Sequence, residues 1–501
     1  MAAEKLLDTY GKNFMTNISK TICIAMIAVI LALSGCARFP VGVSPSSRLL
    51  EPGKLDAGSA IHAAAKQPSA WPSQEWWKAY GDPQLDRLVA EAITGNPTMH
   101  IAQSRVAVYQ ALSGVAKSAL FPEIQADVSF TRELFTEHYF IPPPYAGNWS
   151  WYNTATVGLV YDLDLWGKNR GALAEALDYV QMSTAESQEV RLAIETAVVR
   201  VYVQLSLQHV LLDIARETLR QREEILNIIQ KRLSAGLATE IDLRQAETVV
   251  PAARAEVEKI SESIETSRNQ LSALVGKGPG YGEQIRRPTL SLALQIGLPS
   301  AIPADLLGRR PDVVAQRWRV EATGKGIDVA KAAFYPNINL TAFVGWQSLG
   351  FSKFLSLESL TSGFGPAISL PIFEGGRLRS QLRVSTAQYD IAVESYNYTL
   401  IRALENVANQ IGILRSLEKQ RTETYQSYAL ANRTYDITLQ GFRSGVTDYL
   451  NVLNAENLTI QESQRKAQVE AHFLDAYAAL MQSIGGGVPV NAPQVASGGS
   501  R

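Results

Sequence analysis

Residues that could carry catalysis are few and scattered in this sequence. No pair of its five histidines has the HExxH spacing of a zinc protease, and no GxSxG nucleophile turn or GxxxxGK[ST] phosphate loop occurs. The two cysteines, Cys23 and Cys36, are too few for a disulfide framework or a cysteine-based metal site. We therefore expect no enzyme activity and no bound metal. Each histidine is expected to be packed or solvated: His62, His100, His138, His209 and His472.

The thiol of Cys36 is the group whose surroundings predict a modification. Lys12 and Lys20 precede an apolar run at 22–33, which ends in Leu33-Ser34-Gly35-Cys36. The run is too short to span a bilayer as a helix, and its flanks fit a signal peptide. The tetrapeptide looks like a bacterial lipobox, whose Cys is lipidated and becomes the first residue after cleavage. A signal peptide with an incidental cysteine is the alternative. We expect the covalent lipid on Cys36 to be the only added group; in lipoproteins that this segment resembles, Ala37 permits delivery to the outer membrane.

The composition sets limits on the protein class. Of the 501 residues, 46% are hydrophobic and 19% are charged, which excludes bulk disorder. The net charge of -1 gives no global basic field for nucleic acid, so no nucleic-acid partner is expected. We find no stretch of about 18 apolar residues, which excludes a helical transmembrane protein. Any membrane crossing must then use β-strands.

The chain contains two copies of one unit. Residues 115–124 (VAKSALFPEI) match residues 329–338 (VAKAAFYPNI), and Arg105 matches Arg319 at the same offset. Because further matches follow in the same order, duplication is favoured over chance similarity. The expected organisation is a signal peptide at 1–35, an extended equatorial segment at 36–84, repeat 1 at 85–283, a linker at 284–303, repeat 2 at 304–484 and a disordered Gly- and Ser-rich tail at 485–501.

Each repeat contains a very long helix followed by a returning helix. A helix from 171 to 235 would be roughly 100 Å long at 1.5 Å per residue. Gly236 and Gly445 end the long helices, and returning helices are predicted at 239–274 and 447–483. The heptad seam of the first long helix is Ile194, Val198, Val201, Leu205, Gln208, Leu212, Ala215, Leu219, Arg222, Leu226, Ile229 and Leu233. The seam of the second is Leu400, Leu404, Val407, Ile411, Leu414, Glu418, Arg421, Tyr425, Tyr428, Asn432, Tyr435, Leu439 and Phe442. Two antiparallel coiled-coil hairpins result.

Alternating apolar residues predict a pair of strands before each hairpin. The strands are expected at 124–131, 154–163, 337–344 and 368–372, joined by aromatic-rich loops. The aromatic residues expected in these loops are Phe135, Tyr139, Phe140, Tyr145, Trp149, Trp151, Tyr152, Trp346, Phe351, Phe354 and Phe364. A soluble sheet packed on a helix is one interpretation; the outer-membrane address favours the other, a membrane sheet. The smallest membrane barrels need eight strands, so several chains would have to share one barrel.

Several longer motifs identify a resemblance. Residues 161–167 (YDLDLWG), 308–313 (GRRPDV) and 370–373 (LPIF) mark the entry to the first long helix, the junction of the repeats and the entry to the second long helix. With Gly81-Asp82-Pro83-Gln84-Leu85, they resemble the outer-membrane factor family of TolC-like channels, in its lipidated OprM/NodT-like branch.

The resemblance implies an α/β membrane channel. Three identical chains would form a twelve-stranded outer-membrane β-barrel, continuous with a periplasmic α-barrel of twelve helices. It implies a passive export duct for drugs or other small molecules in a tripartite efflux system. The partners would be outer-membrane lipid, a periplasmic adaptor (membrane fusion protein) and an inner-membrane pump of the RND type. The alternatives are a lipid-anchored periplasmic coiled-coil adaptor and a duct for protein secretion.

The same resemblance points to site residues at the hairpin turns. The family docks adaptors through such turns, so the docking tips would include Arg232, Gly236, Ser444 and Gly445. A closed periplasmic gate would use the carboxylate of Asp242, with Asp448 as the acid of the second copy. Two positions that carry aspartate in TolC-like channels are Asn451 and Asn454 here, which weakens a claim of strong cation selectivity. Arg244 and Arg443 are the expected partners of the gate acids.

Overall fold

The computed structural model describes residues 43–51, 55–56, 71–138, 140–292 and 309–487, which form two compact units. Unit 1 comprises residues 1–48, 110–179 and 320–393, and unit 2 comprises residues 49–109, 180–319 and 394–501. Each unit therefore takes segments from both sequence repeats. The predicted signal peptide and Cys36 lie outside the described residues.

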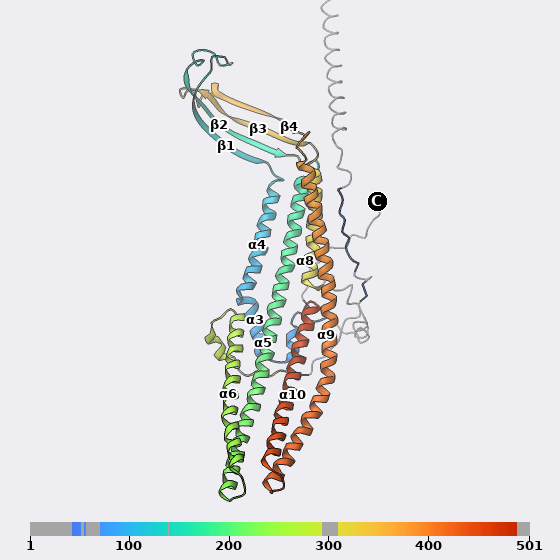
Figure 1. The fold of residues 1–501 in the computed structure, drawn as a ribbon. Helices are drawn as coiled ribbons and strands as arrows, with labels where there is room; N and C mark the ends of the chain where they lie inside the picture. The colour runs from blue at the N-terminus through green and yellow to red at the C-terminus, as the bar shows by residue number, and fades with distance from the viewer. Residues whose placement is uncertain (1–42, 52–54, 57–70, 139, 293–308, 488–501) are drawn as a thin grey trace, which may run out of the picture. The chain divides into compact units, whose positions relative to one another are not determined.

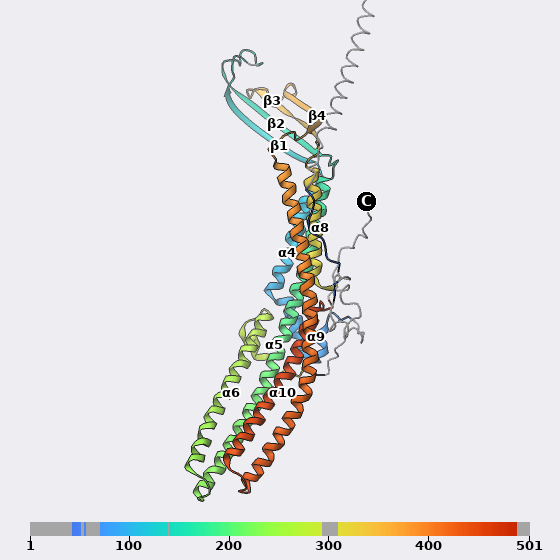
Figure 2. The same ribbon diagram turned by 45° about the vertical axis from the view of Figure 1, so that its right-hand side comes forward.

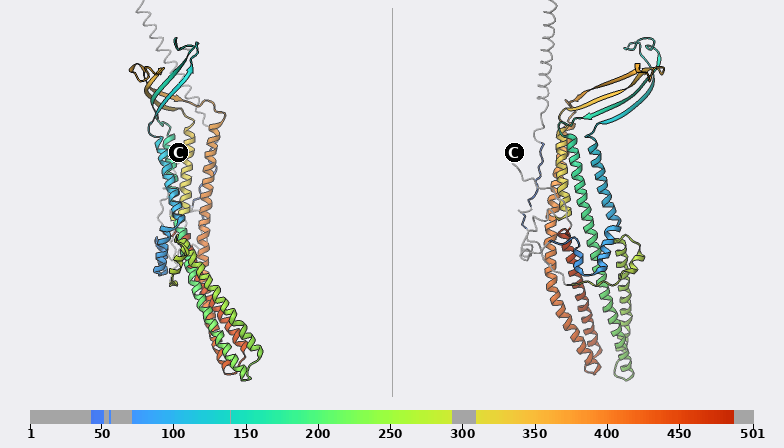
Figure 3. Two further views of the ribbon diagram at one scale, coloured as in Figure 1. Left: turned by 90° about the vertical axis from the view of Figure 1, so that its left-hand side faces the viewer. Right: turned by 180° about the vertical axis from the view of Figure 1, so that it is seen from behind.

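Unit 1 is built around one antiparallel sheet with strand order β1-β2-β3-β4 (Figures 1 and 3). Its strands are β1 (Glu123–Leu134), β2 (Trp149–Asp162), β3 (Asn337–Leu349) and β4 (Leu360–Ser369), and a short turn of helix, η4 (Leu357–Ser359), precedes β4. The central pairing joins the two repeats, with Val157 of β2 opposite Val344 of β3.

The sheet has one apolar and one polar face. Paired residues lie on the same face, and successive residues of a strand lie on opposite faces. The apolar face carries Ile124, Val128, Phe130, Leu134, Trp149, Trp151, Val157, Leu159, Leu340, Val344, Trp346, Leu360, Phe364 and Ile368. The polar face carries Gln125, Asp127, Ser129, Thr131, Glu133, Thr154, Thr156, Asn339, Thr341, Gln347 and Thr361. A two-faced sheet of this kind suits a boundary between lipid and water.

The fourth strand was misplaced by the sequence pattern. It was expected at 368–372, but β4 ends at Ser369. Gly363, Gly365 and Pro366 conceal the strand, because glycine and proline are depleted in sheets. Pro366 is tolerated because, among the described strands, β4 pairs only with β3 and lies at an edge of the sheet. Five of the aromatic residues expected in loops lie in strands instead: Trp149, Trp151 and Tyr152 in β2, Trp346 in β3 and Phe364 in β4. Phe135, Phe140, Tyr145, Phe351 and Phe354 lie in the loops, as expected, and Tyr139 lies outside the described residues.

Unit 2 contains two helical hairpins. The long helices α5 (Lys168–Ser234) and α9 (Arg377–Arg443) have 67 residues each, and parts of both belong to unit 1. Each is followed by a helix of 35 residues, α6 (Glu240–Leu274) and α10 (Tyr449–Ser483), which runs back alongside it (Figure 2). The remaining helices of unit 2 are η2 (Trp76–Tyr80), α3 (Pro83–Gly95) and η3 (Pro279–Gln284), while α4 (Pro97–Ser118) and α8 (Pro311–Ala332) are divided between the two units. The two hairpins predicted from the heptads are confirmed.

Helix α5 follows its predicted seam. Every seam position from Ile194 to Leu233 is buried or half-buried. Among the described helices, α5 is long and apolar enough to cross a membrane by length and composition alone. An 18-residue window of α5 has a mean hydropathy of 1.2, and 39% of the window is buried. A helix that packs in the core of an assembly passes the same test of length and composition.

Helix α9 departs from its predicted seam over its second half. Leu417, Thr424 and Ala431 are buried, whereas the predicted positions Glu418 and Asn432 are exposed. The buried and half-buried positions are three residues apart twice in succession at 411, 414 and 417, and four residues apart twice in succession at 431, 435 and 439. Such stammers and stutters change the local winding of a coiled coil. The seam therefore shifts by one residue and later shifts back.

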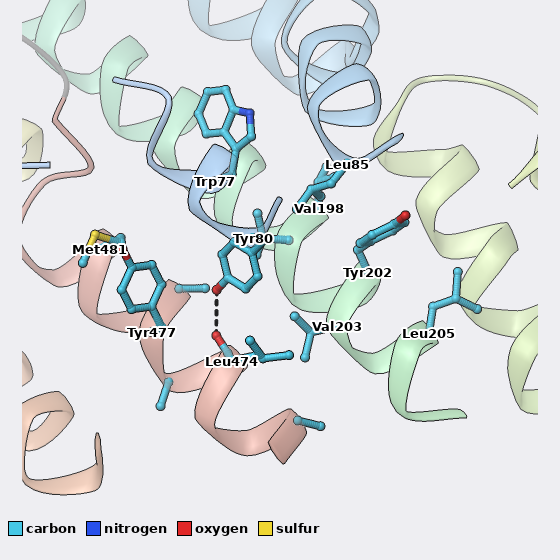
Figure 4. Close-up of a cluster of buried hydrophobic side chains, with 14 of the residues drawn as sticks. Trp77, Tyr80, Leu85, Val198, Tyr202, Val203, Leu205, Leu474, Tyr477 and Met481 are labelled. Atoms are coloured by element: carbon cyan, nitrogen blue, oxygen red, sulfur yellow. Dashed lines mark hydrogen bonds between the residues drawn. The ribbon is translucent and has the colours of Figure 1, made fainter. Parts of the chain in front are cut away.

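The N-terminal segment of unit 2 packs between the hairpins. Tyr80 is fully buried, and its Oη donates a hydrogen bond of 2.7 Å to the carbonyl of Leu474 on α10 (Figure 4). Asp82 caps α3 and also accepts hydrogen bonds from Tyr202 Oη of α5 (2.7 Å) and the Thr289 N–H (2.8 Å). Burial acts to raise the pKa of Asp82, but these hydrogen bonds hold it below its ordinary value. The GDPQL motif at residues 81–85 therefore has a structural role, because its Asp82 bonds the N-terminal segment to α5 and to Thr289.

The expected disorder of the tail is wrong for Gly485, Gly486 and Gly487. Gly485 and Gly486 are buried, and a Cβ added at Gly485 would lie 2.2 Å from the carbonyl oxygen of Arg309. These glycines allow the chain to pack closely after α10. The rest of the predicted tail, 488–501, lies outside the described residues.

Candidate functional site: the paired helical tips

The turn at the end of each hairpin has the same backbone geometry. Gly236 has φ +73° and Gly445 has φ +77°, the left-handed region that favours glycine. The Leu237 N–H donates to the Arg232 carbonyl (2.8 Å), and the Val446 N–H donates to the Gly441 carbonyl (2.8 Å). These are the long bonds of Schellman motifs, which satisfy the last carbonyls of α5 and α9. The predicted role of both glycines as helix ends is confirmed.

Each turn presents a pair of apolar side chains to solvent. Leu237 and Ile241 are both 69% exposed, and Val446 and Leu450 are 84% and 54% exposed. Leu237 and Val446 directly follow the two turn glycines, and Ile241 and Leu450 lie four residues further on in the returning helices. Matching apolar residues at the ends of two helical hairpins form a compact surface for binding another protein.

The two turns are joined within the chain by Arg232. Its guanidinium donates a hydrogen bond of 2.8 Å to the carbonyl of Phe442 at the end of α9, and it lies 4.6 Å from the centre of the Phe442 ring. Arg232 was predicted to flank a docking surface; it is partly buried and links one hairpin to the other. Ser444 is exposed, and its hydroxyl donates to the carbonyl of Gln440 in α9.

A recess of about 410 Å³ lies between the two turns. Arg232, Leu237, Asp242, Gly445 and Asp448 all line it. Below it, an apolar cluster packs the hairpins together: Ile225, Ile229, Ala246, Tyr435, Phe442, Tyr449, Val452 and Ala455. The fold therefore brings both predicted gate acids into one recess.

Both gate acids also cap helices. Asp242 forms a capping box with Thr239, whose N–H (2.9 Å) and hydroxyl (2.7 Å) donate to its Oδ2. Asp448 is the N-cap of α10 and accepts the Asn451 N–H at 2.9 Å. A carboxylate near the start of a helix is stabilised by the backbone N–H groups there. Within one chain, then, each acid has a sufficient structural role.

The arginines expected to pair with the gate acids do not pair with them among the described residues. Arg244 pairs with Glu240 (2.7 Å) and Glu247 (2.8 Å) along its own helix. Arg443 is exposed at the end of α9, and the described part of the chain offers it no ion pair. Asp242 is held by the capping box instead, because its local partner Thr239 lies only three residues away.

A buried ion pair between the hairpins was not predicted. Nε of Arg222 in α5 lies 3.4 Å from Oε1 of Glu456 in α10, and their side chains are 14% and 2% exposed. Arg222 also reaches the carbonyl of Val249 in α6 and Oδ1 of Asn457, both at 3.3 Å. Burial raises the pKa of Glu456, and Arg222 opposes that rise. Arg222, the one charged residue in the predicted α5 seam, was the available signal.

The structure also bears on metal binding. Among the residues that it describes, no group of three or more His, Cys, Asp or Glu side chains could hold a metal ion.

Comparisons with known proteins agree with one another. Residues 88–277 and 302–486 match the model of the outer membrane efflux protein family. The chain is 46% identical over 372 residues to the fusaric acid resistance protein FusA of Burkholderia cepacia, a match that covers 73% of this chain and 69% of that protein. It is 28% identical over 478 residues to the multidrug resistance outer membrane protein MdtP of Escherichia coli K12, covering 94% and 97%.

Two solved structures extend the comparison. The outer membrane protein VceC of Vibrio cholerae has a TM-score of 0.78 and 32% identity, and the match covers 83% of this chain and all of that one. The outer-membrane channel OprN has a TM-score of 0.78 and 25% identity, covering 89% and 98%. The fold class predicted from the sequence is confirmed.

Proposed function

The chain belongs to the outer membrane efflux protein family, and from this premise we propose which partners complete its tripartite efflux system. It is an outer membrane efflux channel, as the sequence predicted. Its partners are a periplasmic adaptor, an inner-membrane pump of the RND type and two further copies of itself. Its family and fold are those of channel proteins rather than enzymes, and we propose no cofactor beyond a lipid on Cys36.

The open edges of the sheet are the observation that supports assembly of several copies into one barrel. Among the described residues, β1 and β4 each pair with one strand only, so both edges of the sheet are open. Open edges with a lipid-facing apolar surface require pairing in a membrane. Four strands are too few to close a barrel and the smallest barrels need eight, so several copies must share one; the three copies proposed here supply twelve. Exposed apolar side chains also line α4 (Ile101, Val108, Leu112 and Val115), and neighbouring copies would cover them.

The adaptor binds at the paired turns in this proposal. Leu237, Ile241, Val446 and Leu450 supply the apolar contacts. Gly236 and Gly445 set the backbone that presents them, and Ser444 lies beside Gly445. Arg232 keeps the two turns at a fixed spacing through Phe442. Small organic toxicants are the cargo that we propose, since the relatives are named for drug and fusaric acid resistance. These names favour small-molecule efflux over protein secretion.

The recess between the turns is the proposed gate. In a trimer, Asp242 and Asp448 would each occur three times around the axis, and Arg443 is placed to meet a neighbouring copy. We expect Asp242→Asn, which removes the charge, to raise single-channel conductance in planar bilayers. Thr239→Ala removes the capping partner but keeps the carboxylate, and should leave conductance unchanged. If Thr239→Ala raises conductance as much as Asp242→Asn does, the carboxylate serves only as a cap.

Lipidation of Cys36 is proposed as an accessory anchor. A single lipid attachment adds modest membrane affinity, and a closed barrel is itself held in the bilayer. We therefore expect the Cys36→Ser variant, with its signal peptide retained for export, to remain in the outer membrane. It should migrate on gels as a trimer that dissociates on heating. A lipid-anchored periplasmic coiled-coil protein would instead become soluble and show no heat-dependent shift, which would refute the channel assembly.

A further inference from the structure

The two loops at the far end of the sheet of unit 1 fold onto opposite faces. Phe351 and Phe354 of the β3–β4 loop lie 5.5 Å from Phe130, and Phe351 lies 5.4 Å from Trp151, ring centre to ring centre. Phe130 and Trp151 belong to the apolar face, so this loop covers that face.

The β1–β2 loop covers the polar face. Phe135 begins this loop and is buried, and its backbone pairs with Asn148 and Gly147. The loop also contacts β3, because the Oη of Tyr145 lies 3.5 Å from the carbonyl oxygen of Leu349. Between the loop and the ends of the strands is a cleft of about 660 Å³, within the range of small-molecule sites. Glu133, Tyr152, Gln347, Leu349 and Thr361 line it from the polar face, and Leu134, Ser348 and Leu360 lie at its edge on the apolar face. All four strands or their ends contribute to its lining.

The lining of this cleft combines aromatic rings with carboxylates. Its apolar side comes from Phe135, Phe140 and Leu349, and Tyr152 contributes a ring whose Oη accepts a hydrogen bond of 2.6 Å from Gln347. The carboxylates are Glu133 and Glu358.

The charge of the cleft is negative. Lys353, which is not a lining residue, pairs with Glu358 at 2.7 Å. Glu133 makes no ion pair among the residues that the structure describes, and none of the described lining residues is lysine or arginine. An unneutralised carboxylate beside aromatic faces attracts an organic cation through charge and through cation–π contact.

We propose that this cleft is a binding site for amphipathic organic cations at the exit of the channel. The ammonium group lies against Glu133, and the apolar body lies against Phe135, Phe140 and Tyr152. The proposal rests on the channel function, because it requires the polar face of the sheet to line the lumen. The site would hold cationic cargo briefly before release and would let anionic cargo pass.

The test uses the full chain in planar bilayers, with blockers added on the side of the strand loops. Benzyltrimethylammonium combines a permanent positive charge with a ring, tetramethylammonium lacks the ring, and benzenesulfonate reverses the charge. We expect benzyltrimethylammonium to reduce the current at the lowest concentration. Glu133→Gln should raise its half-blocking concentration roughly tenfold, as for the loss of one charge contact. Phe140→Leu, at a side chain that is 80% exposed, should weaken block without disturbing the fold.

Glu123→Gln is the matched control, because Glu123 lies on the same strand and the same face at its opposite end. Its half-blocking concentration should equal that of the unchanged chain. Equal block by benzyltrimethylammonium and benzenesulfonate, or no effect of Glu133→Gln, overturns the site. Equilibrium dialysis of benzyltrimethylammonium against the detergent-purified chain separates the two proposals. If the chain binds the cation in a way that depends on Glu133 but conducts no current, the binding site is supported and the channel function is contradicted.

Discussion

Gly236→Val and Gly445→Val are expected to reduce drug resistance to the level of cells that lack the channel. Valine in the left-handed region costs roughly 1–2 kcal/mol, so the Schellman turn should rearrange. Rearrangement moves Leu237 or Val446, the exposed apolar residue that follows each glycine. The fold should survive, because a Cβ at either position meets no atom within 4 Å. The measurement is the minimum inhibitory concentration of exported compounds, alongside the amount of heat-dissociable trimer.

Two controls separate docking from general strain. Gly350→Val places the same strain in the β3–β4 connection of unit 1, since Gly350 has φ +79° and open space around it. It should leave resistance unchanged. Gly236→Asn should also retain resistance, because asparagine tolerates the left-handed region. Full resistance in Gly236→Val would show that adaptor binding does not depend on the conformation of this turn.

Arg222→Met should give the largest loss of stability among the charged residues of the hairpins. It leaves the buried carboxylate of Glu456 without its cation, and breaking a buried pair in this way costs about 3–5 kcal/mol. The double variant Arg222→Met/Glu456→Met should recover most of that loss, because two apolar side chains can pack where the pair was. The midpoint temperature of the helical circular dichroism signal measures both effects, and protease cleavage near the α5–α6 turn reports on the tip itself.

Arg254→Met is the control for this pair. Arg254 of α6 and Glu223 of α5 also form an ion pair between helices, at 2.7 Å, but their side chains are 63% and 46% exposed. Exposed pairs contribute about 0–1 kcal/mol, so little change is expected despite the shorter distance. Additive effects of Arg222→Met and Glu456→Met would contradict the coupling.

The pH dependence of Arg222→Met has a definite sign. Burial raises the pKa of Glu456, so the folded chain holds this proton more tightly than the unfolded chain does. Stability from such a group rises as the pH falls through the folded-state pKa. Removal of the guanidinium should raise this pKa further. The destabilisation of Arg222→Met should therefore be smaller at acid pH than at neutral pH.

The sequence predicted the hairpins well because their signals are local and repeated. The seam from Ile194 to Leu233 keeps a strict heptad, and Gly236 and Gly445 mark the turns without ambiguity. The second half of α9 was less predictable. Its polar residues allow two registers, and contacts with distant helices bury Thr424 and Ala431 in place of Tyr425 and Asn432. Strand β4 was concealed in the same way, since its pairing with β3 outweighs a weak local preference.

The candidate site was predictable in position but not in its contacts. The family resemblance suggested Asp242 and Asp448 at the starts of the two returning helices, and the fold brings both into one recess. Their bonding is decided by the nearest backbone and hydroxyl donors, Thr239 and the Asn451 N–H, which compete with arginines further away. The pairing of Arg222 with Glu456 joins residues from different repeats, and no local pattern encodes such a distance.

The pairing of β2 with β3 also constrains the order in which the chain can fold. The β1–β2 and β3–β4 pairs are local hairpins, but the contact between them joins Val157 to Val344, with the whole first helical hairpin between them in the sequence. Contacts of such long sequence separation form slowly. During biogenesis the β1–β2 hairpin must wait, with an open edge and an apolar face, until the second repeat has been made. That interval is when the chain is most exposed to aggregation, and when it has the greatest need of a periplasmic chaperone.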